Sequence, residues 1–272
     1  MGSSQRGILK KTTNKANKAK REKRKTDSMK KKIILALDGL SSGRAIELIM
    51  KLGQRLRAVK LHDLLDFYGP SIIVALKEAG AEVPWVDYKL HDTKDTVALR
   101  VRALIKNGAK IITVHASGGI PMMKAALEAT FSESGERLAE IYGITLLTSL
   151  DDVEIRRIYG KDRTREQIVH ELALMAHEAG VRTVVCSAME VKMLKESSDL
   201  PEMKFTVPGT RSAGIALGQQ KRSGTPKQAI DDGADELVAG SQVTKAEDPV
   251  AAFESMASEI SEEEGASTDV KT

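Results

Sequence analysis

The sequence predicts an α/β protein of the (β/α)8 barrel class with a disordered basic tail at its N-terminus. Three observations support this prediction. Short apolar runs alternate with longer segments of helical period along most of the chain. The apolar runs are unbroken rather than alternating, which is typical of parallel strands covered on both faces. Eight such runs over about 225 residues fit a single barrel domain.

The predicted strands follow one another at regular intervals. They lie at 32–38 (KIILALD), 58–61 (AVKL), 83–89 (VPWVDYK), 110–116 (KIITVHA), 141–148 (IYGITLLT), 181–186 (VRTVVC), 203–209 (MKFTVPG) and 236–241 (ELVAGS). Amphipathic segments between them predict helices, among them 42–56, 69–80, 96–108, 121–133, 164–180 and 225–233. Several of these segments end in glycine, as helix C-termini often do. An open doubly wound sheet is the alternative, but no GxGxxG motif follows the first strand.

The two ends of the chain differ from its middle in charge and polarity. Residues 1–28 contain ten lysines and arginines and two acidic residues, so their net charge is +8. The remaining residues have a net charge of −4, which gives +4 for the whole chain. With almost no apolar side chains, this tail is predicted to be disordered. We interpret it as a solubilising extension or as sequence upstream of a second start at Met29, and do not expect it to bind nucleic acid. Residues 259–272 are predicted to form a disordered acidic tail, which leaves 29–258 for the barrel.

The composition points to a cytoplasmic protein. A single cysteine, Cys186, excludes an internal disulfide, and its apolar setting predicts a buried, unreactive thiol. No apolar run approaches the length of about 18 residues needed to span a bilayer. The N-terminus has no apolar segment of the secretory type. We therefore expect no membrane association.

Polar residues gather at the predicted C-terminal ends of the strands, where barrel enzymes carry their active sites. These strand ends are Asp38, Lys60, Asp87 with Lys89, His115, Thr148 with Ser149, Pro208 with Gly209, and Gly240 with Ser241. The first four ends are the most strongly polar. This pattern predicts an active-site mouth at that end of the barrel.

A charged string, VDYKLHDTKDTV, ends the third strand. Residues two apart on a strand face the same side, so Asp87 and Lys89 are both expected to point inward, near Lys60 and Asp38. Asp92 follows in the loop. Alternating acids and bases in one site hold each other ionised, and a lysine kept as an ammonium can protonate a developing carbanion. The histidines form no metal-binding spacing, so a site without a metal is predicted.

The spacing D-x-K-x-x-D followed by threonine, here Asp87, Lys89, Asp92 and Thr96, resembles the signature of the orotidine 5′-phosphate decarboxylase family. The resemblance covers roughly residues 32–250. It includes, in order, LALD, VK at the second strand, VHASGG, LLTSL, VPGTR and Q-x-R-x-x-TP. Together these motifs are specific.

The resemblance implies a carboxy-lyase that converts orotidine 5′-phosphate to UMP and carbon dioxide in de novo pyrimidine biosynthesis. It implies that Lys89 protonates C6 of the pyrimidine while Asp87 lies against the substrate carboxylate. It implies that Lys60 orients Asp87 and contacts the ribose, and that Asp38 binds the ribose hydroxyls. No metal, flavin or other cofactor is implied.

The remaining residues of the family pattern predict contacts to the base, the phosphate and a second subunit. Ser149 is expected to bind the pyrimidine ring, and Gln220 to reach towards the phosphate. Asp92 and Thr96 are expected to extend into the site of the partner subunit, which implies a homodimer.

One position departs from the family pattern. The family ends strand eight with Gly-Arg, and the arginine grips the phosphate, whereas this chain has Ser241 there. The change removes a bidentate, charge-assisted contact, so weaker activity is an alternative. The phosphate has other candidate ligands in the backbone N–H groups at Gly209 and around Gly240 and Ser241, and Pro208 is expected to lie beside it. Arg222 is either the compensating cation or a solvated loop arginine.

Two other functions remain open. The first is a magnesium-dependent sugar-phosphate decarboxylase or synthase of the same suprafamily, which has an acidic residue where this chain has Lys60. The second is a non-catalytic, nucleotide-binding paralogue. Ser241 and the basic tail favour the paralogue, whereas the intact set of Lys60, Asp87, Lys89 and Asp92 argues against it.

Overall fold

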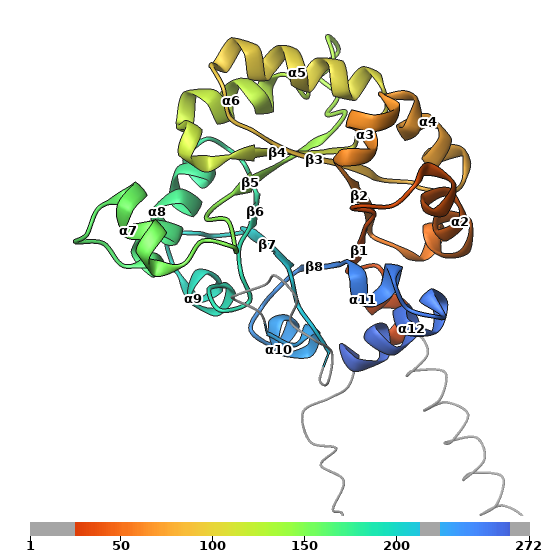
Figure 1. The fold of residues 1–272 in the computed structure, drawn as a ribbon. Coiled ribbons are helices and arrows are strands. Elements are labelled where there is room, and N and C mark those ends of the chain that lie inside the picture. Colours follow the sequence, from red (N-terminus) through yellow and green to blue (C-terminus); the bar gives the residue numbers. More distant parts are fainter. Residues whose placement is uncertain (1–24, 213–223, 262–272) are drawn as a thin grey trace, which may run out of the picture.

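Eight parallel strands form a closed barrel in sequence order, with helices around the outside (Figure 1). The structure is a computed structural model and describes residues 25–212 and 224–261. The strands are β1 (Ile33–Ala36), β2 (Ala58–Leu61), β3 (Pro84–Leu90), β4 (Ile111–His115), β5 (Glu140–Ile144), β6 (Thr183–Val185), β7 (Lys204–Pro208) and β8 (Glu236–Ala239). Each pairs with the next, and β8 pairs with β1. The predicted fold class and all eight predicted strands are confirmed.

Helices cover the outer face of every part of the barrel (Figure 1). They are α2 (Ser42–Leu52), α3 (Asp63–Tyr68), α4 (Ser71–Glu78), α5 (Lys94–Lys106), α6 (Ile120–Glu128), α7 (Asp152–Tyr159), α8 (Arg165–Glu178), α9 (Val191–Glu196), α10 (Pro226–Asp231), α11 (Ser241–Thr244) and α12 (Pro249–Glu259), with 3-10 turns at Gly53–Arg55 and Ala116–Gly118. Thr164 and Gln167 form a capping box that starts α8. The glycines that follow α4, α5, α8 and α10 all have positive φ, so the predicted C-terminal signals are confirmed.

The inside of the barrel is filled by its own layer of side chains. This inner cluster is Ile34, Ala36, Ala58, Trp85, Ile111, Tyr142, Ile144, Val185 and Val238. Trp85 and Tyr142 are its largest members, and their ring centroids lie 5.3 Å apart. A filled interior is a packed core and not a channel, so a ligand can bind only at an end of the barrel.

A polar network closes the N-terminal end of the barrel. Glu236 at the start of β8 accepts hydrogen bonds from Tyr142 (2.9 Å) and Thr206 (2.8 Å) and pairs with Arg57 Nε at 2.7 Å. These residues come from β5, β7, β8 and the segment before β2. The network ties strands from across the barrel together and leaves the C-terminal end free for chemistry.

Some strands are shorter than predicted at the end that carries the candidate site. β1 ends at Ala36, so Asp38 lies in the following turn. β5 ends at Ile144, so Thr148 and Ser149 lie in a loop rather than on the strand. Apolar composition alone does not show where ladder hydrogen bonds stop, because loop residues at this end are also partly buried.

The domain boundaries also shift. Residues 25–30 are helical, so the prediction of disorder was wrong for the last residues of the 1–28 tail. Lys30 in this segment pairs with Glu254 on α12 at 2.7 Å, and the Thr26 hydroxyl lies 3.3 Å from that of Ser261. At the other end, Ile260 is buried against the core beyond the predicted boundary at 258.

Two further predictions concern single features. Cys186 is buried, as predicted. Among the described residues, no helix combines the length and the apolar character that crossing a membrane requires.

Candidate active site

A cavity of about 380 Å³ opens at the C-terminal ends of the strands, where the sequence predicted the site. Eight of the predicted site residues line it: Asp38, Lys60, Asp87, Lys89, Pro208, Gly209, Gly240 and Ser241. They come from β1 to β3 on one side and from β7 and β8 on the other. The closed barrel thus brings together residues as far apart in the sequence as Asp38 and Ser241.

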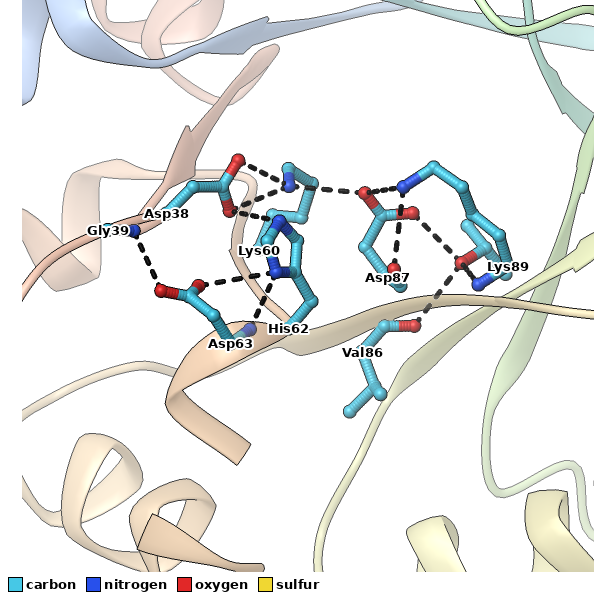
Figure 2. Close-up of polar contacts among 9 residues, drawn as sticks. Asp38, Gly39, Lys60, His62, Asp63, Val86, Asp87 and Lys89 are labelled. Atoms are coloured by element: carbon cyan, nitrogen blue, oxygen red, sulfur yellow. Dashed lines mark hydrogen bonds and ion pairs between the residues drawn. The ribbon is translucent and has the colours of Figure 1, made fainter. Parts of the chain in front are cut away.

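Four charged side chains form a continuous chain across one wall of the cavity (Figure 2). Lys60 Nζ lies 2.9 Å from both carboxylate oxygens of Asp38 and 3.1 Å from Oδ2 of Asp87. Lys89 Nζ lies 2.8 Å from the same Asp87 oxygen. Each buried charge therefore has a partner of opposite sign, which offsets the cost of removing it from water.

Lys89 reaches Asp87 through an irregularity in β3. The register with β4 shifts between Val86 and Leu90, and Lys89 itself has a φ of 47°. Thr113 on β4 fixes this shape, because its hydroxyl donates to Asp87 Oδ1 at 2.9 Å and accepts from the Lys89 N–H at 3.0 Å. Bulges of this kind re-aim a side chain and often lie beside active sites. Sequence reasoning did not single out Thr113.

The surroundings favour the ionised forms of two members of the chain. Burial alone would raise the pKa of Asp38, but the hydrogen bond from His62 and the charge of Lys60 outweigh it and lower this pKa to about 2. For Lys60, burial acts to lower the pKa, yet the charges of Asp87 and Asp38 are stronger and raise it. The array thus presents fixed charges to whatever enters the cavity.

His62 lies beside this array, in contrast to the prediction that the histidines join no metal-like group. Its Nε2 is 3.3 Å from Asp38 Oδ1, and its Nδ1 accepts from the Asp63 N–H at 2.6 Å. Candidate ligand atoms of Asp38, His62 and Asp63 all lie within 4.8 Å of one another. The ammonium of Lys60 already contacts both oxygens of Asp38, so a metal ion here would face a positive charge.

The opposite wall, at the ends of β7 and β8, contains a cation that the prediction missed. Arg211 lines the cavity, and its Nη2 donates to the Ser241 hydroxyl at 3.3 Å. Gly209 precedes it with a φ of 78°, a conformation that glycine adopts without strain. The signal was present in the motif VPGTR, but the strand-end rule stops at Gly209 and gives no direction for residues in the following loop.

Some predicted site residues lie outside the cavity lining. Asp92 is exposed in the loop after β3, and its carboxylate accepts a hydrogen bond from the N–H of Thr93 at 2.7 Å. Thr96 lies in α5 and its hydroxyl accepts from that of Thr93 at 2.9 Å. Ser149 is exposed next to Thr148, which does line the cavity. Gln220 and Arg222 lie outside the described residues, so the predicted role of Arg222 stays a prediction.

The sole tryptophan of the chain, Trp85, lies at the floor of the cavity. Its side chain is 1% exposed, and its Nε1 has no hydrogen-bond partner among the described residues. Trp85 is two residues before Asp87 on β3, so both side chains face the barrel axis. Its fluorescence is therefore a natural reporter of ligand binding.

Comparison with known proteins agrees with this geometry. Residues 31–256 match the model of the orotidine 5′-phosphate decarboxylase / HUMPS family. The chain is 39% identical to the orotidine 5′-phosphate decarboxylase of Pseudoalteromonas translucida over 224 residues, covering 81% of this chain and 93% of the relative. It is 39% identical to that of Moorella thermoacetica over 237 residues, covering 85% and 92%. The crystal structure of the Lactobacillus acidophilus enzyme of the same name superposes with a TM-score of 0.71 at 31% identity, covering 84% of this chain and 98% of that one. The chain therefore belongs to the orotidine 5′-phosphate decarboxylase / HUMPS family.

Proposed function

We propose that this chain is an orotidine 5′-phosphate decarboxylase, which releases carbon dioxide and forms UMP in pyrimidine biosynthesis. Family membership over most of the chain supports this activity. The observation that carries it is the Lys60–Asp87–Lys89 array at the mouth of the barrel. It supplies a fixed carboxylate and an adjacent ammonium. The carboxylate favours the loss of carbon dioxide, and the ammonium protonates the product carbon.

We propose the following roles for the array. Asp87 lies against the substrate carboxylate, and the repulsion between the two anions is relieved as neutral carbon dioxide leaves. The bond from C6 to the carboxyl carbon breaks, and its electron pair stays on C6. Lys89 transfers an ammonium proton to C6 and is itself reprotonated from water. Lys60 holds Asp87 in place through the 3.1 Å ion pair.

The rest of the cavity suits the other parts of the nucleotide. Asp38 is the candidate to bind the ribose hydroxyls, since its carboxylate borders the cavity beside Lys60. Ser149 is the candidate for the pyrimidine ring. The backbone at Pro208 and Gly209, with Gly240 and Ser241 across from it, is the candidate for the phosphate, and Arg211 adds a cation there.

We further propose that the active form is a homodimer that works in the cytoplasm. Asp92 is exposed and does not line the cavity of its own chain, as expected of a residue that serves the site of a partner. Large apolar side chains are exposed on nearby helices, with Phe67 on α3 79% exposed and Leu99 on α5 65% exposed. Tyr88 on β3 links these helices, because its hydroxyl donates to Asp66 on α3 and its ring lies under Arg100 of α5. An exposed apolar surface of this kind is typical of an interface.

The test of the activity is the loss of orotidine 5′-phosphate absorbance with purified protein in the presence of EDTA. We expect turnover, and we expect Lys89→Ala to reduce it by about 10³-fold or more, because the proton donor is lost. Lys192→Gln, which changes an exposed lysine on α9, is the control and should leave turnover unchanged. No turnover by the unmodified protein at saturating substrate would refute the proposal. No turnover of orotidine 5′-phosphate, together with magnesium-dependent turnover of a sugar phosphate, would favour the sugar-phosphate alternative.

A further inference from the structure

The rim of the cavity next to β8 carries a second cation besides Arg211. Lys245 directly follows α11 and lines the same cavity as Ser241. The Lys245 N–H donates to the Ser241 carbonyl oxygen at 3.0 Å, so the two residues are one helical turn apart. Side chains four residues apart on a helix lie on the same face. Lys245 therefore projects from the same side of α11 as Ser241, the position where the family pattern has an arginine.

The charges in the cavity are divided between its two sides. On the side of β1 to β3, the carboxylates of Asp38 and Asp87 are balanced by Lys60 and Lys89. Among the described lining residues from β5 to the end of α11, no carboxylate is present. Arg211 and Lys245 are the charged side chains of that side. Their positive charge is left for a ligand, and two such charges match a phosphate monoester, which carries about −1.5 to −2 at neutral pH.

We propose that Lys245 binds the substrate phosphate together with Arg211 and so replaces the arginine that is missing at Ser241. The inference rests on the proposed function and assigns this residue a part in it. The replacement changes the kind of contact. An arginine at 241 would grip the phosphate with a planar, bidentate fork, whereas Lys245 adds a mobile point charge from one turn further along. Binding should then depend more on charge than on geometry, and salt should weaken it.

The test compares two ligands that differ only in the phosphate, UMP and uridine. Binding is followed by the fluorescence of Trp85, excited at the red edge of its absorption, where the pyrimidine does not absorb. We expect Lys245→Gln to raise the Kd for UMP about 10-fold, the equivalent of one charge-assisted contact, and to change the Kd for uridine less than 2-fold. Lys192→Gln serves as the control and should leave both constants unchanged, and Lys245→Arg should keep UMP binding.

A rescue experiment separates binding from a structural role. Adding Ser241→Arg to Lys245→Gln puts a cation back on the same face of α11, and we expect it to restore the affinity for UMP. Equal weakening of UMP and uridine by Lys245→Gln, or no weakening of UMP, would overturn the assignment of Lys245 while leaving the decarboxylase intact. Failure of the unmodified protein to bind UMP and to decarboxylate its substrate would instead overturn the proposed function, and the inference with it.

Discussion

At the scale of single residues, Asp38 links the site to the stability of the fold. Burial acts to raise the pKa of its carboxyl, but His62 and Lys60 hold it at about 2 in the folded chain. The usual value in an unfolded chain is about 3.9. Because the folded pKa is the lower one, the ionised form stabilises the fold. This contribution is complete above about pH 4 and is lost as the pH falls towards 2.

The pH dependence gives a direct prediction. The free energy of unfolding by urea should fall more steeply for the unmodified protein than for Asp38→Asn as the pH is lowered from about 5 to about 2. The asparagine does not titrate, so the difference between the two curves reports this carboxyl together with its pairing to His62 and Lys60. Curves that stay parallel over the whole range would mean that Asp38 has no depressed pKa.

The sequence predicts some of these residues and misses others for a physical reason. Asp38, Lys60, Asp87 and Lys89 were predicted because parallel strands meet at one end, so strand ends identify neighbours in space. Arg211 and Lys245 were not predicted, because Arg211 lies in a loop and Lys245 follows a short helix. Neither strand alternation nor strand order fixes where such side chains point.

At the scale of elements, β3 shows how a correct prediction can rest on an incomplete picture. Regular alternation predicted that Asp87 and Lys89 face the same side, and their contact at 2.8 Å bears this out. The strand is irregular there, however, with Lys89 in the left-handed region and the register to β4 shifted. Long-range contact with Thr113 selects this shape, and the sequence of β3 alone does not reveal it.

Helix α2 offers a prediction at this scale, from two glycines with opposite surroundings. A Cβ on Gly53, after the helix, would lie 2.6 Å from the carbonyl oxygen of Gly80, so Gly53→Ala should lower the free energy of unfolding by about 1–3 kcal/mol. Gly43, in the first turn of the helix, has open space around its Cβ position, so Gly43→Ala should raise this free energy by about 0.5 kcal/mol. Chemical denaturation of both variants is the measurement. Equal effects would mean that the approach of the two backbones is not a packing constraint.

At the scale of the whole molecule, the sequence predicts the barrel well because the fold repeats one simple unit. Each predicted strand coincides with an observed one, although β5 ends at Ile144 rather than at Thr148. The association of one whole barrel with another does not follow from this repeat. Whether two barrels associate depends on exposed side chains such as Phe67 and Leu99. Their exposure follows from the fold, and the hydrophobic periodicity of the sequence does not predict it.

Mixing two inactive variants tests whether sites are shared between subunits. Lys89→Ala and Asp92→Asn should each lose most activity. If Asp92 serves the partner's site, a hybrid dimer has one site with both substitutions and one with neither. Random exchange then makes about a quarter of all sites native, so activity should recover to about that fraction of the unmodified enzyme.

A second mixture provides the control for this experiment. Lys60 and Lys89 both contact Asp87 within one chain, so a mixture of Lys60→Ala with Lys89→Ala leaves every site with a defect and should stay inactive. If the first mixture also stays inactive after subunit exchange has been verified, Asp92 acts within its own chain and does not serve the site of a partner. The 2.7 Å hydrogen bond that its carboxylate accepts from the Thr93 N–H would then be its main contact, one that fixes the loop just before α5 and does not complete a neighbour's site.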